Sequence, residues 1–177
     1  SSINEFTNIP GSPIAYWVSD AVRAIFKDTL SLEDISISEG QNITANNDTY
    51  LRSFWEVDQR SVGVGKKWLF YAKGGDYRKW WGNLEYVVDW SKDARNFYRS
   101  NGSARIIPEY LWYRPGVTWT LLSSSHTGFR YLPESATFDK TGSSIFMKND
   151  ADIPYAISLL CSNVSTFLLR IFSSTIA

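Results

Sequence analysis

Apolar residues recur at intervals of three and four in two segments of the chain, a spacing that places them on one face of a helix. The first segment covers residues 14–26 and the second covers residues 154–172. Pro154 suits the first turn of the second helix, because a proline there gives up no backbone hydrogen bond. The pattern therefore predicts a helix near each end of the sequence.

Between these two segments the apolar positions form short runs bounded by turn-forming residues, which is typical of β-strands. A further helix is expected over residues 93–100, because Asn101 and Gly102 follow as a stop signal. The combination predicts an α+β fold, with a curved, mostly antiparallel sheet and flanking helices. The expected strands cover residues 37–44, 49–57, 67–72, 85–90, 117–123, 129–132 and 136–139.

The beginning of the chain differs from the rest. Residues 9–13 read Ile-Pro-Gly-Ser-Pro, which cannot be helical throughout. We therefore divide the sequence into a linker with a helix over residues 1–27 and a main domain over residues 28–177. A chain of 177 residues can bury a proper core within one domain.

Aromatic residues are unusually frequent, since 8 Trp, 10 Tyr and 10 Phe make up 16% of the chain. One small core cannot bury so many rings. We expect some of them at an interface with a second domain, a partner or a ligand.

The residues needed for catalysis are scarce. His126 is the only histidine, and no G-x-S-x-G, phosphate-loop or H-E-x-x-H motif occurs. The Asn-Pro-Pro-Tyr and Asp-Pro-Pro-Tyr motifs of adenine methyltransferases are absent as well. We therefore predict no catalytic residue, no metal site and no cofactor within this chain.

Cysteine content and hydropathy bear on the compartment. Cys161 is the only cysteine, which excludes an internal disulfide and is typical of a reducing compartment. No run of 18 apolar residues occurs, so we expect no membrane partner.

Charge is distributed unevenly although the formal net charge is zero. Residues 28–59 carry seven acidic side chains and one basic one, whereas residues 60–105 carry ten basic and four acidic ones. Two interpretations stay open: the blocks scatter over the folded surface, or the second block forms a basic face suited to phosphates.

Residues 66–83 hold the densest group of candidate binding residues, with five basic residues, six aromatic residues and three glycines. Basic side chains neutralise phosphates, and glycines allow the backbone to approach them closely. Alternatively, the aromatic rings are core and the lysines form a solvated rim. The predicted phosphate contacts are Lys66, Lys67, Lys73, Gly74, Gly75 and Lys79, with Arg78 as a further cation.

Base recognition calls for side chains with paired donors and acceptors, such as arginine for guanine and asparagine for adenine. Two polar loops, residues 41–48 and 123–128, are either base-reading loops or ordinary hairpin tips. The predicted base contacts are Asn46, Asn47, Arg78, Asn83, His126 and Arg130. This prediction requires the cations of residues 66–83 to emerge together on one concave surface.

Several strings resemble the PglX-type adenine-specific DNA methyltransferases of bacterial BREX phage-defence systems, in the same order and at similar spacing. They are residues 9–19 (IPGSPIAYWVS), 54–57 (FWEV), 73–80 (KGGDYRKW), 85–90 (EYVVDW), 116–119 (GVTW), 123–125 (SSS) and 142–146 (GSSIF).

The resemblance implies a target recognition domain without its catalytic domain, to which residues 1–27 would connect. In that family the catalytic domain binds S-adenosylmethionine and methylates adenine. The implied partners are double-stranded DNA, the catalytic domain of the same parent chain and other BREX subunits, in the bacterial cytoplasm. The alternative is a protein-interaction module that docks the catalytic domain or other BREX subunits and reads no bases.

Overall fold

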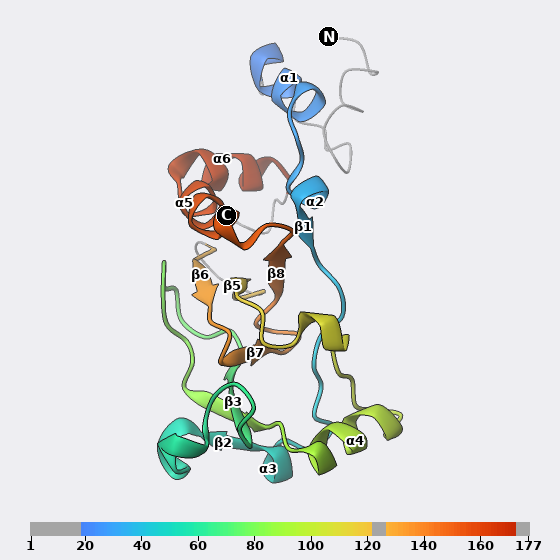
Figure 1. The fold of residues 1–177 in the computed structure, drawn as a ribbon. Helices are drawn as coiled ribbons and strands as arrows, with labels where there is room; N and C mark the ends of the chain where they lie inside the picture. Colours follow the sequence, from blue (N-terminus) through green and yellow to red (C-terminus); the bar gives the residue numbers. More distant parts are fainter. Residues whose placement is uncertain (1–18, 122–126, 173–177) are drawn as a thin grey trace.

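The strands form two four-stranded sheets, one above the other in Figure 1, in a computed structural model that describes residues 19–121 and 127–172. Every strand pair is antiparallel except β3 with β7. The α+β class with mostly antiparallel strands is confirmed, but the strands lie in two sheets and not in one. The first sheet has the order β1 (Ser36–Ile37), β8 (Ser144–Met147), β5 (Gly116–Trp119) and β6 (Phe129–Leu132), and the second has the order β2 (Leu51–Ser53), β4 (Tyr86–Asp89), β3 (Trp68–Ala72) and β7 (Ala136–Phe138).

A short turn at residues 133–135 carries the chain from the first sheet to the second. Pro133 follows the last residue of β6 and has no N–H to donate, so the strand ends there. The carbonyl of Pro133 then accepts a hydrogen bond from Ala136, the first residue of β7. Strands β6 and β7 thus lie in different sheets although only three residues separate them.

Helix α5 (Ile153–Leu160) packs on the first sheet, and α6 (Asn163–Phe172) follows and packs against α5, as Figure 1 shows. Apolar side chains of α5 pack on those of β5, β6 and β8, and full burial of such a side chain contributes roughly 1.5–3 kcal/mol. The buried members of this cluster are Val117, Phe129, Ile145, Met147, Ile153, Ala156, Ile157 and Cys161.

The predicted single helix over residues 154–172 is wrong in its middle, where α5 and α6 meet at 76°. At this bend, hydrogen bonds of serine side chains take the place of the backbone hydrogen bonds that a continuous helix would have. The hydroxyl of Ser165 donates to the carbonyl of Leu159 at 2.6 Å, and the hydroxyl of Ser162 accepts from the backbone N–H of Ser165 at 3.2 Å. Apolar periodicity continues through the bend, so it gives no sign of such local competition.

The second sheet packs against α4 (Lys92–Ser100), the helix expected over residues 93–100. Ser91 caps this helix by accepting a hydrogen bond from the N–H of Ala94. Aromatic rings fill much of this core, and Trp90 contacts Trp112 edge-on. The buried members are Leu69, Tyr71, Val88, Trp90, Ala94, Tyr98 and Ala104.

A third cluster joins the two sheets. Leu132 and Phe146 come from the first sheet, whereas Ala72, Ala136 and Phe138 come from the second, and all five are buried. The sheets therefore share one continuous packed region and cannot move apart without exposing it.

The N-terminal helix α1 (Asp20–Asp28) begins later than expected, because the Ser19 side chain caps it by accepting from the N–H of Val22. Residues 14–18 of the predicted helix lie outside the described residues. The short helix α2 (Leu32–Ile35) follows, with a capping box between Ser31 and Asp34. The boundary between residues 27 and 28 stays a prediction.

Two expected strands are mostly replaced by other structure. In the segment 37–44 only the first residue is in a strand, and Asn42 and Ile43 make isolated bridges. The segment 49–57 holds the end of helix α3 (Asn47–Tyr50), then β2, then a 3-10 turn over Phe54–Glu56. Strand β8 was not among the expected strands.

The close contact between the chain at Gly142 and the second sheet gives a stability prediction. A Cβ at Gly142 would overlap the carbonyl oxygen of Ala72. We expect Gly142→Ala to lower the free energy of unfolding by about 1–3 kcal/mol, measured by urea denaturation. Gly102→Ala is the matched control, because nothing lies within 4 Å of its added Cβ. Equal stability of the two variants would contradict the packing described.

Candidate nucleic-acid interface

The segment of residues 73–83, here called the glycine loop, leaves β3, reaches the edge of the first sheet and returns to β4. At that edge the N–H of Trp80 donates to the carbonyl of Phe129 at 3.0 Å. The N–H of Tyr131 in turn donates to the carbonyl of Trp80 at 2.9 Å. The loop is thus attached to both sheets.

The loop needs an unusual backbone. Gly74, Gly75 and Gly82 have φ angles of 84°, 113° and 123°, a region that side chains disfavour. Trp80 and Asn83 also have positive φ, at 72° and 58°. Asparagine tolerates this region better than most residues, whereas a bulky tryptophan there is strained.

Asn83 closes the loop on itself. Its side chain is buried, and Nδ2 donates to the carbonyl of Asp76 at 2.8 Å. A Cβ at Gly75 would lie 3.1 Å from the same Nδ2, so the glycine makes room for the amide. Asn83, predicted to contact a base, instead holds the shape of the loop in this structure.

Two of the three cations in the loop are engaged within the protein. The Nζ of Lys73 lies 3.3 Å from Oδ2 of Asp139, and the Nζ of Lys79 donates to the carbonyl of Cys161 at 2.7 Å, at the C-terminus of α5. Arg78, by contrast, is exposed, and its Cδ lies where a Cβ at Gly82 would come within 2.9 Å. Gly82 therefore leaves space for the Arg78 side chain to cross the loop.

The glycine loop forms one wall of a groove with a volume of about 560 Å³. Trp55 and Tyr86 contribute exposed rings, and Asp76 and Glu85 contribute carboxylates. Five predicted site residues line this groove: Lys73, Gly74, Gly75, Arg78 and Asn83. The structure thus brings the glycine-rich half of the predicted segment together with aromatic rings from another part of the chain.

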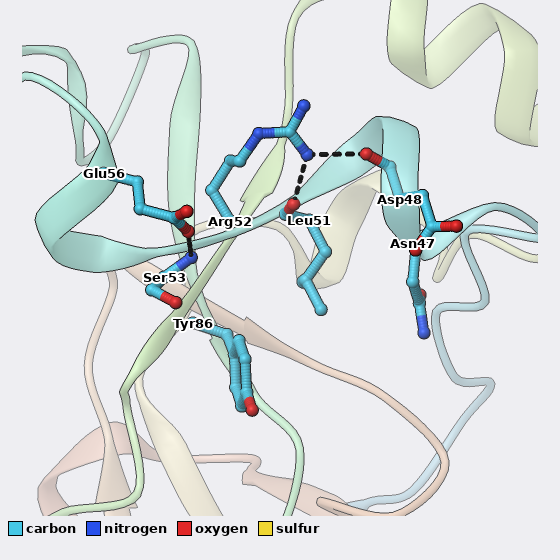
Figure 2. A pocket seen from close by; sticks show the side chains of 7 residues that line it. All are labelled: Asn47, Asp48, Leu51, Arg52, Ser53, Glu56 and Tyr86. Atoms are coloured by element: carbon cyan, nitrogen blue, oxygen red, sulfur yellow. Dashed lines mark hydrogen bonds between the residues drawn. The ribbon is translucent and has the colours of Figure 1, made fainter.

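A second depression of about 400 Å³ shares Ser53 and Tyr86 with this groove (Figure 2). Arg52 does not extend into solvent there, because its Nη1 donates to the carbonyls of Asp48 at 2.7 Å and Leu51 at 2.5 Å. Asn47 lines the same depression. Asn47 and Arg78 thus line two separate hollows that share Ser53 and Tyr86.

Asn46 and Asn47 are exposed at the start of α3, and both already have a structural contact. Oδ1 of Asn46 accepts from the N–H of Thr49 at 3.1 Å as a helix cap. Oδ1 of Asn47 accepts from the hydroxyl of Thr44 at 2.7 Å. These contacts leave the amide nitrogens of both side chains for other partners.

Lys66 and Lys67 lie away from the groove. They precede β3 whereas the glycine loop follows it, so a strand of roughly 17 Å separates them from Lys73. Lys67 also lies over the ring of Trp68, with Nζ 5.0 Å from its centroid. The cations of residues 66–83 therefore do not lie together on one concave surface. The condition that we attached to the predicted base contacts is not met.

Arg130 is almost fully buried, with 1% of its surface exposed. Its guanidinium donates to the carbonyl of Gly128 at 3.0 Å, and burial lowers its pKa, with Glu85 acting in the opposite direction. In this conformation it cannot touch a base edge. His126 lies outside the described residues.

Exposed aromatic rings lie within the glycine loop and beside it, as the aromatic excess led us to expect. Trp80 and Trp81 are more than half exposed, and Trp81 stacks on Tyr131 with centroids 6.1 Å apart. Sequence reasoning singled out Arg78 but missed the contribution of Trp55 and Tyr86 to the groove. The only signal was their place in the strings at residues 54–57 and 85–90.

Among the described residues, no group of three or more His, Cys, Asp or Glu side chains could hold a metal ion. No single described helix is long and apolar enough to cross a membrane; residues 150–160 and 163–171 reach that length and composition only as a bent pair.

Comparison with known proteins places this chain. It is 34% identical over 166 residues to the adenine-specific methyltransferase BrxX of Escherichia coli O9:H4 (strain HS), an alignment that covers 90% of the chain. It is 31% identical over 186 residues to the adenine-specific methyltransferase PglX of Lacticaseibacillus casei (strain Zhang), covering 96% of the chain. The chain is homologous to part of the BrxX and PglX adenine-specific methyltransferases.

The homology is limited to a segment of each relative. The chain spans 13% of the length of BrxX and 16% of the length of PglX. No family model matches the chain. The resemblance to PglX-type proteins noted in the sequence is confirmed.

The role of Asn83 in the loop gives a second stability prediction. Asn83→Ala removes a buried hydrogen bond and places alanine at positive φ, so we expect a loss of about 1–3 kcal/mol in the free energy of unfolding. Urea denaturation measures it, with Lys66→Ala at an exposed turn as the control. An Asn83→Ala protein as stable as this control would show that the amide does not hold the loop.

Proposed function

We propose that this chain is a target recognition domain that reads a specific sequence in double-stranded DNA for an adenine-specific methyltransferase. Its homology to part of BrxX and PglX supports a role within such an enzyme. The observation that carries the proposal is the groove in which the glycine loop presents the exposed Arg78 beside Trp55 and Tyr86.

Arg78 is the principal base-reading residue in this proposal. A guanidinium donates two parallel hydrogen bonds to O6 and N7 of guanine in the major groove. Asn47 lines the adjoining depression and can pair its amide with adenine. Asp76 and Glu85 lie close enough to the groove to accept from the amine of cytosine. The site therefore contains hydrogen-bond donors (Arg78 and Asn47) as well as acceptors (Asp76 and Glu85), as discrimination between bases requires.

Phosphate contacts would come from more than one part of the surface. Lys66 and Lys67 are exposed at one end of β3, and the glycine loop lies at the other. Because roughly 17 Å separates them, Lys66 and Lys67 would contact phosphates at a different part of the duplex from the glycine loop. The backbone N–H of Gly75 would add positive potential without a side chain. Lys73 and Lys79 support the loop from inside.

The chemistry of methyl transfer would belong to the rest of the parent protein. A catalytic domain that binds S-adenosylmethionine would flip the target adenine out of the duplex, which costs roughly a few kcal/mol. Contacts of the recognition domain with neighbouring base pairs would offset this cost. The setting would be the bacterial cytoplasm, with other BREX subunits as further partners.

Arg78→Ala tests the proposal directly. We expect preference for the target sequence to fall by roughly 1–3 kcal/mol, because the guanidinium is lost while the groove remains. A methylome of a bacterial host that carries the full-length parent protein measures the preference. Arg60→Ala is the control, since Arg60 is exposed and pairs only locally with Asp58. Methylation of the same sites at wild-type rate by Arg78→Ala would refute the assignment.

A second function is favoured by Trp80. This ring is 54% exposed although its backbone is strained, so folding alone does not explain a tryptophan there. It borders a hollow of about 580 Å³ lined by Pro115, Tyr131, Ile153 and other residues. We infer that this face docks the catalytic domain of the parent chain.

Trp80→Ala separates docking from DNA reading. We expect it to weaken association of this chain with a separately produced catalytic domain by about 2 kcal/mol or more, as for a buried interface tryptophan. Titration calorimetry at two salt concentrations measures it, since an aromatic interface depends little on salt. Tyr110→Ala, an exposed ring elsewhere, is the control. Equal affinity of both variants would refute docking at this face.

A further inference from the structure

The side chains of Arg130, which is buried, and Thr120, which is partly exposed, form a bridge between two points of the glycine loop. The hydroxyl of Thr120 donates to the carbonyl of Gly75 at 3.1 Å and accepts from Nη2 of Arg130 at 3.3 Å. Nη1 of Arg130 reaches the carbonyls of Gly128 at 3.0 Å and Arg78 at 3.5 Å. The network thus connects the backbone at Gly75 to the backbone at Arg78 through the first sheet.

Burial of an unpaired guanidinium at this position is unfavourable for the stability of the fold. No carboxylate pairs with Arg130 among the ion pairs of the described residues, and its buried Nε has no hydrogen-bond partner. Removing a charge from water is unfavourable, and apolar residues of similar volume often serve equally well or better. Packing alone therefore does not account for arginine here.

The backbone beside this network is strained. Trp80 and Asn83 have positive φ angles, and such residues persist only where the surroundings fix them. Gly128 contributes by its lack of a side chain, since a Cβ there would overlap the Arg78 carbonyl. The loop segment from which Arg78 projects is thus held by contacts from β6, Thr120 and Gly128.

We infer that Arg130 and Thr120 are positioning residues for sequence recognition, which fix the backbone of the glycine loop so that the Arg78 side chain enters the groove in one orientation. This inference rests on the proposed function. It replaces direct base contact by Arg130, because a buried guanidinium acts through the loop it holds. Base discrimination depends on donor geometry within fractions of an ångström, so a loosened loop would still carry its charge and lose its selectivity.

Thr120→Val and Arg130→Met remove the bridge with little change in shape. Thr120→Ser keeps the hydroxyl and is the matched control for the first; Arg130→Lys keeps a charge but cannot contact both Thr120 and the loop carbonyls. We expect about tenfold faster amide exchange in peptides from residues 74–84 for Thr120→Val and Arg130→Met, and near wild-type exchange for Thr120→Ser. The exchange of β4 should not change in any variant.

Selectivity is then measured with the full-length parent protein carrying each variant, by the methylome of a bacterial host. We expect the preference for the best sequence to fall about tenfold in Thr120→Val and Arg130→Met, with Thr120→Ser at the wild-type value. Arg130→Met should keep its melting temperature, as expected for the loss of an unpaired buried charge.

The outcomes separate the inference from the proposed function. If Arg78→Ala leaves the sequence preference of the full-length parent protein unchanged, the proposed function is overturned and this inference with it. A wild-type preference that survives unchanged in Thr120→Val and Arg130→Met overturns the inference alone. If Arg130→Met unfolds, Thr120→Val decides, and loss of selectivity in Thr120→Ser to the same extent would show that the hydroxyl bridge is not the cause.

Discussion

The two sheets meet through the apolar contacts of Ala72, Leu132 and Phe138, and the glycine loop begins directly at this junction. Ala72 is the last residue of β3, so the position of the loop is set by the packing of the residue before it. The loop then runs to β6, where the backbone of Trp80 pairs with Phe129 and Tyr131, and returns to β4. Loosening this junction would shift both attachment points of the loop at once, and the groove would lose its shape before the fold was lost.

A buried asparagine strengthens the same region. The amide of Asn42 donates to the hydroxyl of Thr137 at 2.7 Å and to the carbonyl of Phe138 at 2.8 Å, while its Oδ1 accepts from the N–H of Ile107 at 3.0 Å. The backbone carbonyl of Asn42 also accepts from the hydroxyl of Tyr71, whose pKa is raised by burial. A fully satisfied polar group of this kind specifies one arrangement of the chains around it, because any slip would leave buried donors unpaired.

Periodicity was sufficient to predict the elements whose stability comes from an apolar face. Strands β3, β4, β6 and β7 and helix α4 lie close to where their patterns place them. It failed where local polar contacts compete with the pattern, as at the serines between α5 and α6 and at the Asn46 cap of α3. Such contacts depend on single hydrogen bonds that hydrophobic spacing does not record.

The candidate site was predictable in composition but only in part in geometry. The density of glycines and cations identified the loop, and Arg78 does line a groove. The roles of Lys79, Asn83 and Arg130 could not be inferred, because each depends on a partner far away in sequence or on burial by a distant strand. Lys79, for example, reaches the carbonyl of Cys161, 82 residues further along the chain.

The mixed charge of the groove has a consequence for recognition under the proposed function. Asp76 and Glu85 stand beside Arg78, so the groove repels phosphates more than a uniformly basic surface would. Weak phosphate attraction lowers affinity for all sequences, since non-specific binding comes from counterion release. Because selectivity is the ratio of specific to non-specific binding, a groove that attracts phosphates poorly and presents a fixed arginine gains discrimination although it loses affinity. The net charge of zero is then compatible with DNA reading, provided that the remainder of the parent enzyme supplies the affinity.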